Sequence, residues 1–389
     1  MIDSKTPGLY LHIPFCRSKC VYCDFYSIPS GADHAIEFMD AYIDALCTHL
    51  KIFAEKYADQ ISEYDNINTV YFGGGTPSFI GARRLLSIWE SIRKYYYISP
   101  GAEITLEANP DSICRSPDLL YILHDAGFNR LSLGMQSASD RELKTLGRVH
   151  TFEQVRDAVQ IARDSGFENI SLDLIYGLPD QDFKSWRNNL HAAMSLNPEH
   201  ISCYGLKLEP GTPLYHTKEQ YQIPDDDQQA EFYLYAAREF QKNDYIQYEI
   251  SNFARPGRES RHNWKYWNLD PYFGFGPGAH SDFNHIRYAW ARDLNGYIQA
   301  VRDGLEPPLS EYHIISSYER VRERIMLNLR TVSGLNPADF QQDFDGFRPF
   351  LDQCARAGYA YWHNGSISLT PRGFLLSNQI ISRLWELLI

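Results

Sequence analysis

Three cysteines, Cys16, Cys20 and Cys23, lie close together near the start of the chain, in the stretch CRSKCVYC. Thiols at this spacing can hold zinc, form a disulfide with one thiol left over, or hold an iron–sulfur cluster. A structural zinc site needs four ligands, and no fourth cysteine follows here, although His12 could complete such a site from the preceding strand. A cubane cluster on three thiolates would leave one iron open to the nitrogen and oxygen of an amino acid.

Glycines and polar residues at the ends of predicted strands form a second group of candidates. The segment GGGTP, at 73–77, follows a short apolar run, and its glycines let the backbone approach a ligand closely. Exposed N–H and C=O groups there can bind the amino or carboxylate end of a ligand. Other candidates are ambiguous when each is taken alone: Glu107, Gln136, Arg148 and Asp173.

The elements that must position these residues alternate short strands with amphipathic helices over the first 245 residues. Six strand–helix repeats imply parallel pairing through right-handed crossovers, and they fall short of the eight repeats of a closed barrel. We therefore expect an α/β fold, a partial, three-quarter (β/α)6 barrel, with a doubly wound open sheet as the alternative. The predicted strands are 9–13, 69–73, 103–109, 130–136, 170–177 and 200–206, and the helices are 35–58, 81–96, 117–126, 152–165, 183–195 and 227–243.

The pattern changes after residue 245. We expect one further strand at 245–254, and a loop rich in Gly and aromatic residues at 258–281. Beyond it we expect a mostly helical, winged-helix-like C-terminal domain, with a hairpin that turns at Asn364-Gly365. The predicted helices there are 316–331, 337–344, 347–357 and 371–388. The expected domains are 1–245, 246–310 and 311–389.

Charge and hydropathy exclude several classes of function. The formal net charge is −12, and acidic residues at 337–357 disfavour the recognition helix of a nucleic-acid-binding protein. No run approaches the roughly 20 apolar residues that span a bilayer, and the N-terminus has no signal-peptide pattern. We expect a cytoplasmic protein without a transmembrane segment, and peripheral membrane contact stays open.

The spacing C-x3-C-x2-C after a first strand resembles the radical S-adenosylmethionine (SAM) superfamily. In that family three cysteines hold a [4Fe–4S] cluster, the open iron chelates SAM, and an electron from the cluster cleaves SAM to a radical. The segments LYLHIPFC, CDFYS, FGGGTP, LEANP, RLSLGMQS, LGRVH and DLIYGLPDQ resemble one branch of it. That branch holds the oxygen-independent coproporphyrinogen III oxidases (HemN) and the HemW heme chaperones, and the similarity covers nearly the whole chain.

This resemblance implies roles for single residues. The cluster ligands would be Cys16, Cys20 and Cys23. The implied SAM contacts are Tyr10, Gly74, Glu107, Gln136, Arg148 and Asp173, and positions that touch SAM or a second SAM molecule in the oxidases are Tyr22, Gly75 and Thr76. Core packing is the alternative for the two tyrosines, and the number of SAM molecules stays open.

Three features separate an oxidase from a chaperone. The oxidases typically carry another cysteine where this chain has Phe25, and they carry an N-terminal arm for which the residues before Tyr10 are too few. The stretch HNWKYW, at 262–267, matches the HNxxYW heme motif associated with HemW and with some heme-degrading relatives. These features favour the chaperone.

The HNxxYW match has a physical rationale. A neutral imidazole is a good axial ligand for heme iron, which makes His262 the candidate and His280 its rival. Aromatic rings offer flat surfaces to a macrocycle, and Arg261 and Lys265 could meet heme propionates. The alternative is a loop histidine beside aromatic rings that plug the barrel. The predicted heme-binding residues are His262, Asn263, Tyr266 and Trp267.

The sequence therefore predicts a HemW-type heme chaperone that binds a [4Fe–4S] cluster, SAM and heme and delivers heme to apo-hemoproteins. Whether it is also an enzyme stays open. The alternative is an oxygen-independent coproporphyrinogen III oxidase, a radical SAM decarboxylase, and a heme-degrading enzyme is a third candidate. A winged-helix regulator is disfavoured by the acidic C-terminal part.

Overall fold

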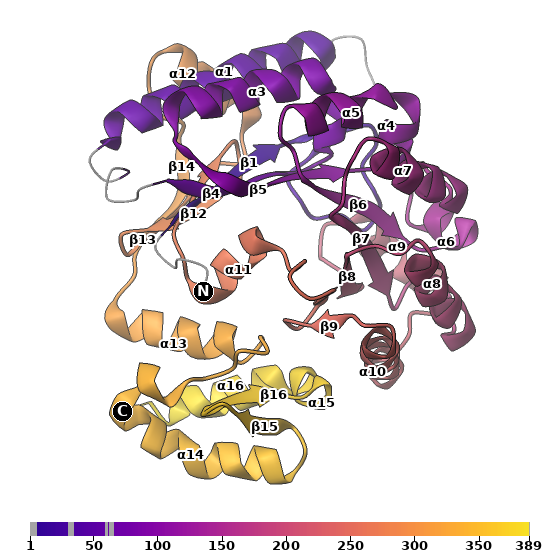
Figure 1. The fold of residues 1–389 in the computed structure, drawn as a ribbon, viewed down its shortest axis with the longest axis vertical. Helices are drawn as coiled ribbons and strands as arrows, with labels where there is room; N and C mark the ends of the chain where they lie inside the picture. Colours follow the sequence, from indigo (N-terminus) through magenta and orange to yellow (C-terminus); the bar gives the residue numbers. More distant parts are fainter. Residues whose placement is uncertain (1–5, 30–34, 59–60, 62–65, 389) are drawn as a thin grey trace.

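The computed structural model describes residues 6–29, 35–58, 61 and 66–388, without the side chains of 35–36 and 341–344. At its centre six parallel strands lie side by side in chain order (Figure 1). They are β1 (Gly8–Ile13), β4 (Ile67–Gly74), β5 (Ile98–Ala108), β6 (Arg130–Gln136), β7 (Ile170–Tyr176) and β8 (His200–Gly205). The predicted α/β fold with a central parallel sheet is confirmed.

Helices follow the central strands and cover one face of the sheet, as Figure 1 shows. Their first turns are well capped: Thr151 and Gln154 form a capping box on α7, and Asp225 and Gln228 form one on α10. The long helices are α1 (Ala35–Lys56), α3 (Ala82–Tyr95), α5 (Asp118–Asp125), α7 (Phe152–Asp164), α8 (Phe183–Ser195) and α10 (Asp226–Lys242), and the short ones are η1 (Pro77–Ile80), α4 (Pro110–Arg115), α6 (Asp140–Thr145), α9 (Pro213–Thr217) and η2 (Lys218–Gln220).

Side chains alternate between the two faces of each strand, and this alternation separates the core from the site. In β6, Leu131 and Leu133 are fully buried in the main hydrophobic core. Arg130 and Ser132 alternate with them in sequence, and both line a cavity on the other face. The helix-covered face therefore supplies the apolar core, while the opposite face carries polar groups.

The segment after residue 245 differs from its prediction. Residues 245–254 form two short antiparallel strands, β9 (Ile246–Gln247) and β10 (Asn252–Ala254), rather than one. The expected loop at 258–281 contains helix α11 (Arg261–Asn268) and strands β11 (Tyr272–Phe275) and β12 (His280–Phe283). The helix is capped by the Ser260 side chain, and β11 pairs with β1, a contact distant in sequence. This pairing is the physical reason that local Gly-rich composition was misleading.

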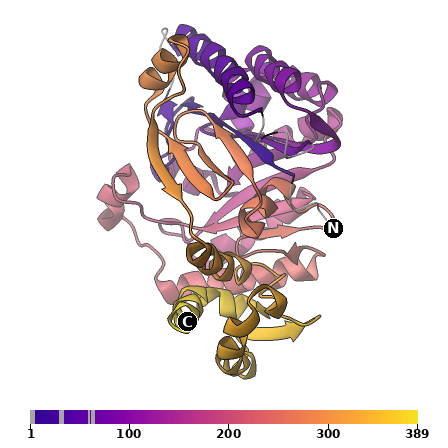
Figure 2. The ribbon, with the colours of Figure 1, turned by 90° about the vertical axis from the view of Figure 1, so that its left-hand side faces the viewer.

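Further strands extend the sheet on the side of β1. The strand β11 is followed in the sheet by β12, β13 (Ile286–Trp290) and β14 (Leu309–Ile314), with helix α12 (Leu294–Arg302) between the last two in sequence. These outer strands pair antiparallel. Figure 2 shows them as orange arrows beside the parallel strands.

The C-terminal part forms a separate layer below the sheet in Figure 1, with its own hydrophobic core. The predicted hairpin is present, as β15 (Ala360–His363) and β16 (Ser366–Leu369), and Asn364 and Gly365 both have positive φ at its turn. The other elements are α13 (Ser317–Asn328), η3 (Pro337–Asp339), α14 (Gln341–Arg356), α15 (Pro371–Leu375) and α16 (Ser377–Glu386). The helices expected at 337–344 and 347–357 are thus mostly one helix, and the one expected at 371–388 is two.

An ion-pair network joins this layer to the outer strands. Asp282 of β12 accepts from Arg320 of α13 at 2.8 Å and from Arg287 of β13 at 2.5 Å, and Arg287 also contacts Glu323 at 2.5 Å. Asp282 is nearly buried, so solvent screens these pairs less than it screens surface pairs. Tyr233 of α10 packs in the C-terminal core and provides a second connection.

Candidate functional site

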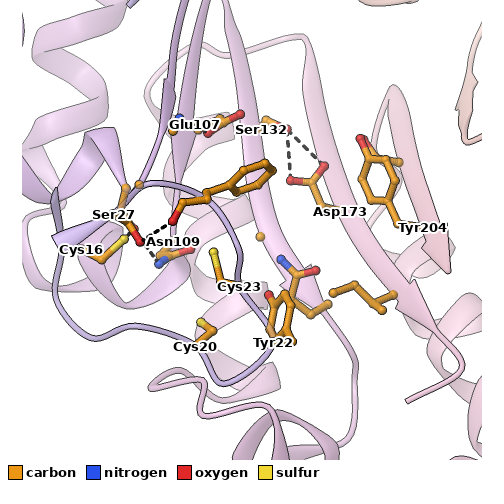
Figure 3. A pocket seen from close by; sticks show the side chains of 18 of the residues that line it. Cys16, Cys20, Tyr22, Cys23, Ser27, Glu107, Asn109, Ser132, Asp173 and Tyr204 are labelled. Carbon is orange, nitrogen blue, oxygen red and sulfur yellow. Dashed lines mark hydrogen bonds between the residues drawn. The ribbon is translucent and has the colours of Figure 1, made fainter. Parts of the chain in front are cut away.

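A cavity of about 470 Å³ opens at the carboxyl ends of the parallel strands, the edge where parallel α/β sheets place their ligands. Figure 3 shows the three cysteines on one side of it and Asp173 and Tyr204 on the other. The predicted residues that line it are Cys16, Cys20, Tyr22, Cys23, Gly74, Gly75, Thr76, Glu107, Gln136, Arg148, Asp173 and Asn263. Four predicted residues are not on its wall: Tyr10, His262, Tyr266 and Trp267.

The cysteine loop is held at both ends and in its middle. Its ends form a two-stranded parallel pair, β2 (Phe15–Cys16) and β3 (Ile28–Pro29). Between them, the Val21 N–H donates to the Leu146 carbonyl at 3.2 Å, and the Val21 carbonyl accepts from the Leu214 N–H at 2.9 Å. These backbone bonds fix the loop against α6 and α9, so the three thiols face the cavity together.

The groups around the sulfurs suit thiolates. Thr76 Oγ1 donates to Cys16 Sγ at 3.4 Å, and Arg148 Nη1 donates to Cys20 Sγ at 3.5 Å. Burial raises the pKa of the Cys16 thiol, while hydrogen bonds from Thr76 and Ser27 act against that rise. Burial likewise raises the pKa of Cys23, opposed by a backbone N–H at Phe25. Donors aimed at sulfur are the environment that a metal-bound thiolate needs.

The three thiols are free, and no three metal-ligating side chains among the described residues converge on a point that would hold a single ion. A cluster differs from a single ion, because its iron corners are separate and each takes its own thiolate. The buried Nε atom of Arg148 also has no hydrogen-bond partner in the described part of the chain. Half-buried thiols, donors directed at sulfur and this unsatisfied Nε–H of Arg148 fit a three-thiolate cluster and an anionic ligand beside it.

The GGGTP segment lies directly against the cysteine loop. The Gly75 N–H donates to the Ile13 carbonyl at 2.9 Å, and the Thr76 N–H donates to the Phe15 carbonyl at 2.8 Å. Gly74 has a φ of 109°, and a Cβ there would lie 2.6 Å from the His12 ring. Only glycine meets both constraints, so the segment forms a backbone cradle next to the cysteines.

Glu107 lies on the cavity wall with both carboxyl oxygens engaged. Its Oε1 accepts from the Tyr71 hydroxyl at 2.8 Å, and its Oε2 accepts from the Gly74 N–H at 3.0 Å. Burial raises the pKa of Glu107 to about 7, opposed by the hydrogen bond from Tyr71 and reinforced by the nearby Asp173 charge. The carboxyl therefore titrates near neutral pH.

This shift predicts a pH dependence of stability. Between pH 4.5 and about 7 the folded chain holds a proton on Glu107 that the unfolded chain has released. The contribution of the protonated form is complete below pH 4.5 and is lost as pH rises to about 7, on the order of 3 kcal/mol. The Glu107→Gln variant lacks this loss, so its melting temperature should gain on the wild type between pH 5 and 8.

Thermal unfolding of both proteins across that range checks the prediction. The Glu249 carboxyl has a similarly raised pKa of about 7, caused by burial, but it is present in both proteins and cancels from the difference. If the difference between the two melting temperatures stays constant from pH 5 to 8, the expected titration of Glu107 is contradicted.

Gln136 and Arg148 occupy the next part of the wall. Gln136 has a φ of 64°, unusual for a residue other than glycine, and this places the strand end in a conformation typical of functional sites. Arg148 Nη2 donates to Asn109 Oδ1 at 2.7 Å and to the Gly134 carbonyl at 2.9 Å. These bonds hold the guanidinium between Cys20 and the end of β6.

The structure also brings in residues that the sequence reasoning missed. The Ser132 hydroxyl donates to Asp173 Oδ1 at 3.2 Å, and burial raises the pKa of Asp173, with a hydrogen bond from Ser202 acting against it. The additional lining residues include Tyr71, Asn109, Arg130, Ser132, Ser202 and Tyr204. Their signal was available: polar residues recur at every second position of the strands, on the face opposite the apolar residues.

The HNWKYW residues lie on α11, at the side of the cavity. His262 is 1% exposed, and its ring nitrogens contact the Thr69 hydroxyl at 2.8 Å and the Tyr266 hydroxyl at 2.9 Å. Burial lowers its pKa to about 3, reinforced by Lys265 and Arg130, so the imidazole is neutral. Tyr10 is likewise engaged, with its hydroxyl 3.1 Å from His12 Nδ1.

The two cations expected to meet heme propionates already donate hydrogen bonds to backbone carbonyls, and His280, the alternative axial ligand, is exposed. Lys265 is buried and donates to the Thr6 carbonyl at 2.5 Å, and Arg261 donates to the Gly101 carbonyl at 2.8 Å. His280, at the start of β12, is exposed to solvent. Asn263 is the HNWKYW residue that reaches the cavity wall.

Comparison with known proteins identifies the family. Residues 10–193 match the family model described as the Radical SAM superfamily. The chain is 35% identical to the heme chaperone HemW of Bacillus subtilis over 95% of its own length and 97% of that protein. The chain belongs to the HemW family. It is also 31% identical to the Escherichia coli HemW heme chaperone, with 98% of both chains covered.

Other similarities agree with HemW membership. The chain is 34% identical to a bovine protein, radical S-adenosyl methionine domain-containing protein 1, mitochondrial, over 87% of this chain and 76% of that one. Its fold is similar to that of the coproporphyrinogen III oxidase HemN from Escherichia coli, with a TM-score of 0.82 at 23% identity, covering 99% of this chain and 91% of that chain. The HemW family thus shares the HemN-like α/β fold. No helix in the described ranges has the length and apolar character of a membrane span.

Proposed function

We propose that this chain is a heme chaperone that binds a [4Fe–4S] cluster, SAM and heme and delivers heme to apo-hemoproteins. The observation that carries the proposal is the similarity to HemW heme chaperones over nearly the full length of both chains. It is supported by Phe25, which is 69% exposed at the cavity and cannot ligate iron where the oxidases typically have a cysteine.

In this proposal the cavity is the cluster and SAM site. Cys16, Cys20 and Cys23 would hold the cluster, which supplies an open iron and an electron when bound. The Gly74–Thr76 segment, Tyr22, Glu107, Gln136, Arg148 and Asp173 would hold SAM, supported by their common position on the wall. Tyr10 is not on the wall and would support it indirectly, because its ring stacks on the Tyr71 ring with the two centroids 6.1 Å apart.

Heme would be bound by α11, with His262 as axial ligand and Asn263, Tyr266 and Trp267 around it. Because Tyr266 occupies one ring nitrogen of His262, this hydroxyl must move before the imidazole can bind iron. We therefore expect Tyr266→Phe to raise heme affinity several-fold and His262→Ala to change the Soret spectrum of the complex. Anaerobic heme titrations of both variants measure this.

His280→Ala is the matched control, since it removes an exposed histidine from the outer strand β12. It should leave the Soret spectrum unchanged. A spectrum that changes in His280→Ala and not in His262→Ala would move the axial ligand to His280.

The function itself is tested by parallel assays on the anaerobically reconstituted chain. Near-stoichiometric heme uptake, followed by transfer to an apo-hemoprotein, is the expected result. Vinyl products formed from coproporphyrinogen III with SAM would instead establish the oxidase. Loss of heme absorbance under reducing conditions with SAM would establish heme degradation.

The finer description of the fold belongs to the same proposal. We infer that the six parallel strands form a three-quarter barrel, that the C-terminal layer is winged-helix-like, and that the domains are 1–245, 246–310 and 311–389. The separate C-terminal core supports the last boundary. A cytoplasmic location, with peripheral membrane contact at most, and no binding of nucleic acid complete the proposal.

A further inference from the structure

A cation that has no ion-pair partner among the described residues lies in the polar interior of the sheet. Arg130, the first residue of β6, is 2% exposed and lines the cavity. Its Nε atom has no hydrogen-bond partner in the described part of the chain. A buried guanidinium cannot lose its proton, and burying a charge without a partner is costly. Such a group is the natural receptor for an anion.

The neighbouring carboxylates do not supply this partner. Glu103 and Asp173 influence Arg130 through space, but neither forms an ion pair with it among the described residues. Glu103 accepts two backbone N–H groups at the start of α11, from Arg261 and His262, each at 3.0 Å. Asp173 accepts from the Ser132 hydroxyl. Both carboxylates are therefore engaged with other donors, and the guanidinium still faces the cavity.

The position of Arg130 separates it from the cysteine loop. Gln136 ends the same strand near that loop, and the six-residue interval corresponds to a rise of at most about 20 Å along the strand. The Asn263 side chain, which can donate two hydrogen bonds, comes to the same cavity from α11. An anion on Arg130 would thus belong to a ligand group distinct from the one beside the cysteines.

We propose that Arg130 and Asn263 form a carboxylate-binding subsite in the interior of the sheet, for a ligand other than the SAM molecule beside the cysteines. A planar guanidinium matches the two oxygens of a carboxylate, and the Asn263 amide on the wall of the same cavity adds a neutral donor. Under the proposed function, on which this assignment of the ligand rests, the group is a propionate of heme. The subsite itself requires only the carboxylate.

The test compares hemin with hemin dimethyl ester, in which both propionates are blocked, by Soret titration of the full chain. The wild type should bind hemin on the order of tenfold more tightly than the ester, as expected for a charged hydrogen bond. In Arg130→Met this ratio should fall to near one, and Arg130→Lys should retain part of it. Thr105→Val, which alters the residue paired with Arg130 across β5 and β6, should keep the full ratio.

Two further measurements separate the sources of the carboxylate and the two proposals. The ratio of the affinities for SAM and for its decarboxylated analogue should be the same in the wild type and in Arg130→Met. If this ratio instead falls to one in the variant, the subsite belongs to SAM and the proposal is overturned. Succinate, against chloride at equal ionic strength, should raise the melting temperature of the wild type and Thr105→Val but not of Arg130→Met.

The outcomes are distinguishable. If the wild type fails to bind hemin while succinate stabilises it through Arg130, the chaperone function fails and the carboxylate subsite stands. If Arg130→Met keeps both the hemin-to-ester ratio and the succinate effect of the wild type, Arg130 only balances the charges of Glu103 and Asp173, and the subsite is overturned.

Discussion

Replacement of Cys20 by alanine is expected to abolish cluster assembly. After anaerobic reconstitution the wild type should carry about four iron atoms per chain, and the variant less than about one. The reason is geometric: three thiolates from one short loop hold three corners, and the four other cysteines of the chain do not line the cavity. The Arg148 guanidinium would also lose the sulfur that it contacts at 3.5 Å. Iron analysis and the visible absorbance of the reconstituted chain measure the effect.

Cysteines elsewhere in the chain provide the control. Cys47 lies on α1, with its thiol 3.6 Å from the Ser87 carbonyl, and does not line the cavity. Cys47→Ala should therefore retain the full iron content, while Cys16→Ala and Cys23→Ala should behave like Cys20→Ala. Stoichiometric zinc in the anaerobically prepared wild type, or full iron content in Cys20→Ala, would refute the cluster assignment.

We expect Gly75→Ala to push the GGGTP segment away from the cysteine loop, which together with it forms the proposed cluster and SAM site. A Cβ at Gly75 would lie 2.8 Å from the carbonyl oxygens of Ile13 and Phe15 and 3.0 Å from the Phe15 nitrogen. These are backbone atoms of the segment that leads into Cys16, so no side chain can move aside. Overpacking of this kind costs about 1–3 kcal/mol, which corresponds to roughly five- to 150-fold weaker SAM binding when the cost falls on the complex. Isothermal titration of the reconstituted variant with SAM should reveal that loss.

The matched control is another glycine-to-alanine change without a clash. Gly346 lies within α14, where an added Cβ would meet no atom closer than 4.0 Å, and alanine has the higher helix propensity. Gly346→Ala should keep the wild-type SAM affinity and melt at the same or a slightly higher temperature. Unchanged SAM binding and stability in Gly75→Ala would show that the two loops are not constrained as described.

The sequence by itself determined the features that depend on local pattern. Apolar runs of strand length and amphipathic helices predicted the six parallel strands, because burial of one face requires that alternation whatever the rest of the chain does. The cysteine spacing and the three glycines were readable for the same reason, since the covalent chain alone sets how close such residues lie. The turn at Asn364-Gly365 followed from the positive φ that these residues tolerate.

Tertiary structure decided the features that depend on partners distant in sequence. The segment 258–281 became a helix and two strands because β11 pairs with β1 and Glu103 accepts the first N–H groups of α11. The burial of His262 follows from Thr69 and Tyr266, which composition does not reveal as its neighbours. Whether Arg130 has a partner likewise depends on which side chains four neighbouring strands bring to one interior. Local patterns decide which face is apolar, but only the assembled sheet decides which polar groups meet on the other.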